Sequence, residues 1–150
     1  MLQESGPYFL YVVEGMIKVL VIGKTKEKYF QQGIDEFLKR LRRFARVEYA
    51  ELSEKAIISS LKDGFVVALD VRGKELSSEE LAVFVKKKEI EGRLVFCVGD
   101  EGGLPEEVMR QASLRLSMSR MTFPHELARL MFLEQLYRAF SINKGLPYHK

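Results

Sequence analysis

The chain has 150 residues, of which 47% are hydrophobic and 30% charged, a balance typical of a folded globular domain rather than a disordered chain. Its formal net charge of +3 does not by itself indicate nucleic acid binding, and no run approaches the roughly 20 apolar residues of a membrane span. The single cysteine, Cys97, lies in an apolar run and cannot form an internal disulfide. Because the sequence also lacks a signal-peptide pattern, we expect a cytoplasmic protein with a buried, unreactive thiol.

Residues 1–15 differ from the rest of the chain. They contain an apolar run at residues 8–13, and the first clean strand pattern begins only at Met16. We therefore interpret residues 1–15 as an extension outside the core and residues 16–150 as one domain. An edge strand or an arm packed on a partner chain is the alternative, because six apolar residues are unfavourable in water.

From Met16 onward, apolar strand patterns alternate with amphipathic helix patterns. The strands are mostly apolar throughout, which is typical of strands covered on both faces in a parallel sheet. The third strand is expected to end at Leu69, in a polar turn over residues 70–74. This alternation predicts an α/β fold with a doubly wound parallel sheet. The expected strands are 16–22, 47–52, 65–69, 93–98 and 114–117, and the expected helices are 26–44, 54–61, 77–90, 105–111 and 125–142.

Two loops that follow successive strands are candidate ligand sites. Residues 99–104 form a glycine-rich turn, and glycines let a ligand approach the backbone. No lysine follows this turn to hold a phosphate, so an ATP or GTP site is not expected. Residues 117–122 are small and polar and lead to Pro124, which suits the first turn of a helix. A strand, loop and helix in this order favour ligand binding, although an ordinary βα turn fits equally well.

The predicted helix over residues 26–44 carries a stripe of cations. Lys39, Arg42, Arg43 and Arg46 recur at helical spacing on a face away from the apolar stripe. A stripe of one sign would suit a phosphate backbone. A solvated helix face is the equally good alternative.

The final predicted helix, residues 125–142, shows more apolar surface than one contact with a sheet needs. Such breadth favours a second packing partner, which could be another subunit. The tail that follows, residues 143–150, carries an aromatic ring, an imidazole and two cations. From the residues alone, a functional tail and a frayed terminus are both open.

Several segments together have a familiar order: residues 16–24, Leu69 with Gly73-Lys74, Val98-Gly99 with Gly103-Leu104, residues 116–125, residues 134–139 and residues 147–150. This pattern resembles the bacterial ribosomal RNA large subunit methyltransferase H family, small enzymes of the SPOUT superfamily. The resemblance implies methylation of N3 of a pseudouridine in 23S rRNA, with S-adenosylmethionine as methyl donor. Because a chain of 150 residues offers a limited footprint on RNA, we expect the assembled ribosome to be the substrate. It also implies a Rossmann-like sheet with a C-terminal trefoil knot, an exception to the unknotted rule, and a homodimer formed through the knot and final helix.

The resemblance also implies a cofactor site. In this family backbone groups hold the adenine, so small residues and tight turns matter more than side-chain chemistry. One departure is Asp100-Glu101, which stands where relatives usually have a second glycine and a small residue. An aspartate tolerates positive φ if that position needs it. Carried over residue by residue, the cofactor-binding positions are Leu69, Gly99, Met118, Ser119, Arg120, Met121, Thr122, Phe123 and Pro124.

Transfer of a methyl group to an imide nitrogen requires alignment of donor and acceptor and loss of the N3 proton. We expect the tail residues Tyr148 and His149 to close over the base, with Arg138 available to a phosphate or to the developing anion. Lys150 and the cation stripe would contact the RNA. His125, the other imidazole, is expected to cap and pack the knot, and no metal is expected.

Two other functions remain open at this point. The chain could be a non-catalytic RNA-binding α/β module that has kept the fold, or a SPOUT methyltransferase that acts on transfer RNA. Calorimetry with S-adenosylmethionine separates a binding module from an enzyme. Labelled cofactor incubated with ribosomes and with transfer RNA separates the two substrates.

Overall fold

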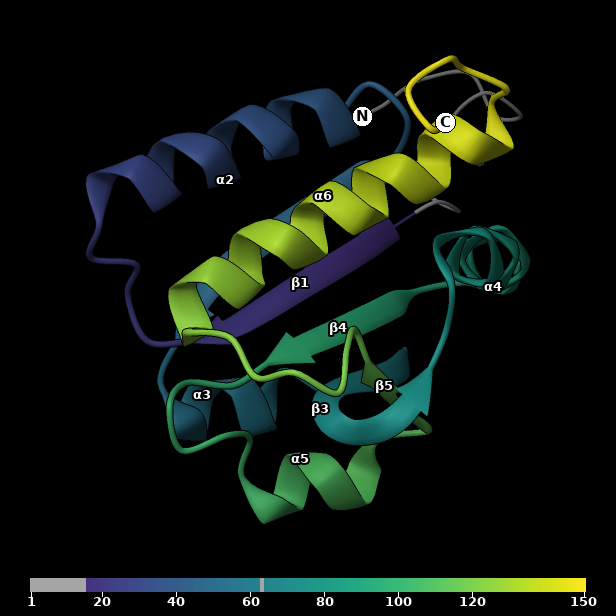
Figure 1. Ribbon diagram of the computed structural model, residues 1–150. Coiled ribbons are helices and arrows are strands. Elements are labelled where there is room, and N and C mark those ends of the chain that lie inside the picture. The colour runs from purple at the N-terminus through teal and green to yellow at the C-terminus, as the bar shows by residue number, and fades with distance from the viewer. Residues whose placement is uncertain (1–15, 63) are drawn as a thin grey trace, which may run out of the picture.

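The computed structural model describes residues 16–62 and 64–150 (Figure 1). The predicted extension, residues 1–15, lies outside the described residues. Strands and helices alternate along the described chain, as the sequence predicts. Their order is β1 (Met16–Ile22), α2 (Lys28–Leu41), β2 (Arg46–Leu52), α3 (Glu54–Ser59), β3 (Phe65–Glu75), α4 (Ser78–Glu91), β4 (Leu94–Val98), α5 (Glu106–Gln111), β5 (Leu114–Ser117) and α6 (His125–Asn143).

The strands form one parallel sheet in the order β2-β1-β4-β3-β5. Helices α2, α6 and α4 cover one face, with α6 between the other two, while α3 and α5 cover the opposite face (Figure 1). Side chains alternate between the two layers: Val19 and Phe96 pack toward α6, whereas Leu20 and Cys97 pack toward α3 and α5. The predicted α/β fold is confirmed. Its parallel strands place every strand-to-helix loop at one edge, called here the carboxyl edge.

Helix α2 ends earlier than predicted, and this changes the cation stripe. The helix stops at Leu41, whose carbonyl accepts the N–H of Phe44 at 2.9 Å and of Ala45 at 3.1 Å. The chain turns here because Arg46 must begin β2 opposite Met16 of β1. Arg42 and Arg43 therefore lie in a turn and Arg46 in a strand. The prediction that these cations share one helical face is wrong.

Strand β3 is longer than predicted and contains a bulge. The expected polar turn over residues 70–74 is part of the strand, and its pairing with β5 jumps from Leu69 to Lys74, both opposite Leu116. Gly73 makes the return to β5 possible, because a Cβ there would lie 2.6 Å from the carbonyl oxygen of Arg115. Residues 70–73 consequently project from the carboxyl edge.

The core lies between the sheet and α6. Phe132 of α6 is fully buried, with its ring centroid 4.7 Å from that of Phe96 in β4. On the other face Cys97 is also fully buried, and burial raises the pKa of its thiol to about 12, so the predicted buried position is confirmed. Among the described residues, none of the helices combines the length and apolar character needed to span a membrane.

Replacement of Phe132 by alanine should lower the free energy of unfolding by about 3–5 kcal/mol, because a buried aromatic ring leaves a cavity between α6 and the sheet. Urea unfolding followed by circular dichroism measures the loss. Val83→Ala is the control, since Val83 of α4 is 68% exposed and its truncation should cost less than about 0.5 kcal/mol. Equal losses in the two variants would contradict this account of the core.

Candidate functional site

A cavity of about 320 Å³ opens at the carboxyl edge of the sheet, beyond β3, β4 and β5. This volume lies at the lower end of the range for small-molecule pockets, roughly 300–1,000 Å³. Three loops and the first turn of α6 build its wall. The lining positions are 69–72, 98–100, 103, 104, 109, 116, 118, 119, 121–123, 125 and 128.

The structure places most of the predicted cofactor-binding residues around this cavity. Arg120 and Pro124 are the exceptions: both are exposed, and Pro124 instead takes the N-cap position of α6. The cofactor role of all nine stays a prediction. The predicted residues that line the cavity are Leu69, Gly99, Met118, Ser119, Met121, Thr122 and Phe123.

The sequence interpretation missed part of the wall. Asp70, Val71 and Arg72 line the cavity because the β3 bulge projects them there. The polar character of residues 70–74 was the available signal, but we interpreted these residues as a simple turn. His125, expected only to cap and pack, also lines the cavity.

The glycine turn after β4 brings bare backbone to the cavity. A Cβ on Gly99 would lie only 2.5 Å from the carbonyl carbon of Gly103, so no side chain fits at Gly99 without a shift of the turn. Gly103 has a φ of +84°, which favours glycine. Asp100 closes the turn itself, because its Oδ1 accepts the N–H of Gly102 at 3.0 Å. The substituted acid therefore has a structural role in the loop.

The loop between β5 and α6 is held by its own hydroxyl groups. Ser117 Oγ donates to the carbonyl of Ser119 at 2.8 Å, and Ser119 Oγ accepts the N–H of Met121 at 3.0 Å. The loop leaves Met121 74% exposed at the rim of the cavity. Its apolar side chains at the cavity, Met118, Met121 and Phe123, can contact the apolar part of a small molecule.

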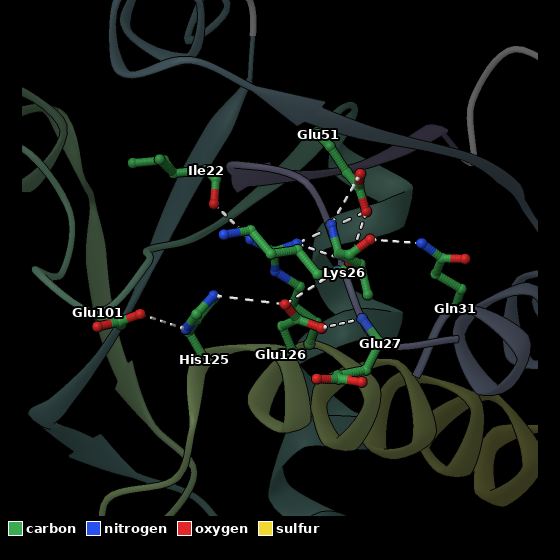
Figure 2. Close-up of polar contacts among 10 residues, drawn as sticks. Ile22, Lys26, Glu27, Gln31, Glu51, Glu101, His125 and Glu126 are labelled. Atoms are coloured by element: carbon green, nitrogen blue, oxygen red, sulfur yellow. Dashed lines mark hydrogen bonds and ion pairs between the residues drawn. The ribbon is translucent and has the colours of Figure 1, made fainter. Parts of the chain in front are cut away.

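Glu126, at the start of α6, joins the cavity wall to the loop between β1 and α2. Its carboxylate accepts the backbone N–H of Lys26 at 3.0 Å and of Glu27 at 3.1 Å (Figure 2). The hydrogen bond from Glu27, followed by that from Lys26, lowers the pKa of Glu126. The preceding residue, His125, lies between two carboxylates, 4.0 Å from an oxygen of Glu126 and 4.0 Å from one of Glu101.

Arg129, one turn further along α6, also binds the loop between β1 and α2. Its side chain is fully buried, and its guanidinium donates to Thr25 Oγ1 at 2.7 Å and to the carbonyl of Ile22. Thr25 Oγ1 in turn donates to Glu51 of β2 at 2.6 Å, and Glu51 lies 3.7 Å from Arg129. A buried guanidinium needs such compensation. The first turn of α6, the end of β1 and β2 are therefore locked together.

The structure brings the three predicted catalytic residues together, but around α6 rather than at the cavity. Arg138 Nη1 lies 3.0 Å from His149 Nδ1, and its guanidinium carbon lies 5.0 Å from the ring centroid of Tyr148. Glu134 accepts from Arg138 at 2.7 Å and from the Tyr148 hydroxyl at 2.8 Å. Burial, and then the bond to Glu134, raises the pKa of Tyr148.

The partners of His149 determine which ring nitrogen carries its proton. A guanidinium can only donate hydrogen bonds, so Nδ1 accepts from Arg138. The neutral ring then carries its proton on Nε2, which donates to Glu79 of α4 at 2.9 Å. The tail thus contacts α6 and α4 of its own chain through oriented polar groups.

The tail lies far from the cavity of its own chain. His125 lines the cavity and Arg138 contacts the tail, and the 13 positions that separate them correspond to about 20 Å of helix. Figure 1 shows the tail beyond the far end of α6, near the end of α2. No tail residue lines the cavity. Within one described chain, the tail and the cavity are separate.

Comparison with known proteins decides the family. A family model described as "Predicted SPOUT methyltransferase" matches residues 16–149. The chain belongs to the SPOUT methyltransferase family. The ribosomal RNA large subunit methyltransferase H of Clostridioides difficile is 43% identical, over 89% of this chain and 99% of that protein. The protein of the same name from Bacillus thuringiensis is 45% identical over the same shares.

A solved structure of a SpoU methyltransferase shows the same fold. The SpoU methyltransferase AviRb from Streptomyces viridochromogenes, in complex with the cofactor AdoMet, superposes with a TM-score of 0.52 at 11% identity. The superposition covers 93% of this chain and 65% of that one. At this identity the likeness concerns the fold alone, and it agrees with a parallel sheet covered by helices on both faces.

The predicted RNA-binding cations of this SPOUT chain lie at the opposite end from the cavity. Lys39, Arg42, Arg43 and Arg46 are all exposed around the end of α2, as is Lys150 at the tail. The aromatic rings of this region connect α2 to the tail through Tyr137 of α6, which stacks on Phe44 and packs edge-on against Tyr148. Among the described residues, no group of three or more His, Cys, Asp and Glu side chains could hold a metal.

Glu126→Gln should remove a contribution to the free energy of unfolding that requires the ionised Glu126 carboxylate. Because the folded pKa of Glu126 is lowered, its stabilisation is present above the unfolded value of about 4.3 and is lost as pH falls through the lower folded pKa. The wild type should therefore be more stable than the variant at pH 7 and 5, and the gap should narrow from pH 4 to 3. Urea unfolding at these pH values measures the difference in the free energy of unfolding between the wild type and the variant.

The control for this series is Glu48→Gln, which alters an exposed carboxylate of β2. It should leave the pH dependence of unfolding close to that of the wild type. A gap between wild type and Glu126→Gln that stays constant down to pH 3 would contradict the assigned role of the Glu126 carboxylate.

Proposed function

We propose that this protein methylates N3 of a pseudouridine in 23S ribosomal RNA, with the assembled ribosome as its substrate. The observation that carries the proposal is the similarity to relatives named ribosomal RNA large subunit methyltransferase H, at 43–45% identity over 99% of their length. The stretch matched by the family model, residues 16–149, includes the cavity loops and nearly all of the tail.

S-adenosylmethionine is the proposed cofactor, and the residues of the cavity fit it. Gly99 leaves backbone bare where a Cβ would clash, as an adenine held by main-chain groups requires. Leu69 and Met118 offer apolar walls, and Asp70 and Asp100 are carboxylates that suit a sulfonium cation. Bound there, the cofactor would supply an electrophilic methyl group. The AdoMet complex of AviRb, which shares the fold, supports this assignment.

The tail is the proposed acceptor side of the reaction. The N3 imide must lose its proton, and we assign His149 to receive it on Nδ1, which becomes available when Arg138 turns from this nitrogen toward the developing anion. Arg138 would stabilise the anion that develops on the base. Tyr148 serves to position the tail, because its raised pKa and its bond to Glu134 keep its hydroxyl protonated.

We further infer that the tail acts across a homodimer. A tail about 20 Å from its own cavity, measured along α6, cannot complete that cavity. In a symmetric dimer, each tail can instead cover the cavity of the partner. Family membership also supports a trefoil knot that includes residues 117–124, at the centre of this interface.

Incubation with labelled S-adenosylmethionine tests the proposed reaction. Label should enter 23S rRNA in ribosomes from a bacterial strain that lacks its own copy of this enzyme, and not transfer RNA. Gly99→Ala should weaken cofactor binding at least tenfold by calorimetry, about 1.4 kcal/mol, because its Cβ meets Gly103. Gly102→Ala is the control, since its Cβ would meet nothing closer than 3.5 Å.

Two results would overturn the proposed function, and a third would overturn the assignment of its cofactor site. Label in transfer RNA but not in ribosomes would assign the alternative SPOUT activity. RNA binding without cofactor binding would assign the non-catalytic module. Equal cofactor affinity in Gly99→Ala and Gly102→Ala would remove the glycine turn from the cofactor site.

Complementation between two inactive variants tests the shared site. One variant ends at Pro147 and lacks Tyr148, His149 and Lys150 of the tail, and the other is Gly99→Ala, assayed at a cofactor concentration too low for this variant to bind. Mixed and allowed to exchange subunits, they should recover about a quarter of wild-type activity, because half of the dimers are mixed and each has one intact cavity with one intact tail. If each tail served its own cavity, no mixture would recover activity.

A further inference from the structure

The loop between β1 and α2 is held more firmly than a surface connection requires. Thr25 at its centre is buried, and it is bonded to Arg129 and to Glu51. The carbonyl of Thr25 also accepts from Gln31 Nε2 at 2.6 Å. Together with the two amides bound by Glu126, these contacts fix the loop backbone on both sides (Figure 2).

This fixed loop presents three lysines to solvent. Lys24 and Lys26 lie in the loop, and Lys28 is the first residue of α2. They alternate with Thr25, which points inward, and with Glu27, and all three lysines are exposed. None of them takes part in an ion pair among residues 16–62 and 64–150, whereas most of the ion-paired cations there have a carboxylate partner on the same element or loop. We call residues 24–28 the basic loop.

The basic loop lies next to the cavity but does not line it. Val21 of β1 pairs with Val98 of β4, so the loop leaves the sheet beside Gly99. Glu126, which binds the loop, directly follows His125 of the cavity wall. No residue of the basic loop lines the cavity itself. Its cations are therefore placed for a ligand that extends beyond the small molecule in the cavity.

We propose that the basic loop binds the phosphodiester backbone of the substrate RNA beside the target nucleotide. This inference rests on the proposed function, because it takes RNA as the substrate. Lysine ammonium groups attract phosphates without regard to base sequence. Because the backbone of the basic loop is already fixed, less conformational entropy is lost when the loop binds RNA. The loop thereby sets where the RNA strand crosses the carboxyl edge.

An exposed aromatic ring borders the basic loop and fits the same ligand. Tyr29, in the first turn of α2, is 63% exposed, and its ring centroid lies 4.6 Å from that of Phe30. Aromatic rings on RNA-binding surfaces stack on unpaired bases. A ring next to three cations is suited to a single-stranded segment rather than to a free phosphate ion.

The test replaces Lys24, Lys26 and Lys28 together by glutamine. The matched control replaces Lys62, Lys86 and Lys87, which are also exposed and lie away from the basic loop. Binding to ribosomes and to naked 23S rRNA is measured over a range of salt concentrations. The loop variant should bind at least tenfold more weakly at low salt, and its slope of log affinity against log salt should fall by about 2 to 3.

Cofactor affinity and urea unfolding of both variants should match the wild type, because all six lysines are exposed and none lines the cavity. Equal RNA affinity and equal salt slope in the two variants would overturn the role of the basic loop. Failure of the proposed function has a different signature, namely a wild type that transfers no methyl group to ribosomes. The RNA affinities of the two variants then still decide whether the basic loop contacts RNA.

Discussion

The carboxyl edge of this protein depends on one buried cation, the guanidinium of Arg129. It binds the last carbonyl of β1 and the hydroxyl of Thr25, while Glu126, one turn earlier on α6, binds the next two amides of the chain. A buried charge is costly when its partners are lost, and among the described residues both Nη atoms of Arg129 are bonded, although Nε is not. The helix that begins at the cavity and the loop beside it therefore keep one relative position, set by directional polar bonds rather than by apolar packing alone.

Much of the fold was predictable because local patterns carry it. Apolar strands between amphipathic helices indicated a parallel sheet, and Ser77 and Glu80, three positions apart, form a capping box at the start of α4. The end of α2 was not predictable in this way. Its helical spacing continues through Arg43, but the pairing of Arg46 with Met16, 30 positions apart, ends the helix at Leu41. A contact so distant in sequence leaves no periodic signal.

The residues of the candidate site fall into the same two groups, those that a local pattern predicts and those that depend on contacts distant in sequence. Gly99 and residues 117–123 could be predicted because the turn chemistry and the family motifs that mark them are carried by neighbouring residues. The contacts that hold the loop between β1 and α2 could not be predicted, because Thr25 and Arg129 are 104 positions apart in the sequence. The bulge of β3 was missed for a related reason: residues 70–74 have the composition of a turn, and only the pairing of Lys74 with β5 keeps them in the strand. The separation of tail and cavity likewise follows from the length of α6.

The burial of Cys97 has a practical consequence for experiments on the proposed two-subunit site. It is the only cysteine of the chain, its sulfur lies within the core, and its thiol has a pKa of about 12. A folded chain therefore offers almost no thiolate to an alkylating reagent. A cysteine introduced on the surface becomes the single reactive thiol, so a spin label or dye can be attached to the tail without removal of Cys97. Distances between two labelled copies then report the geometry of the assembly directly.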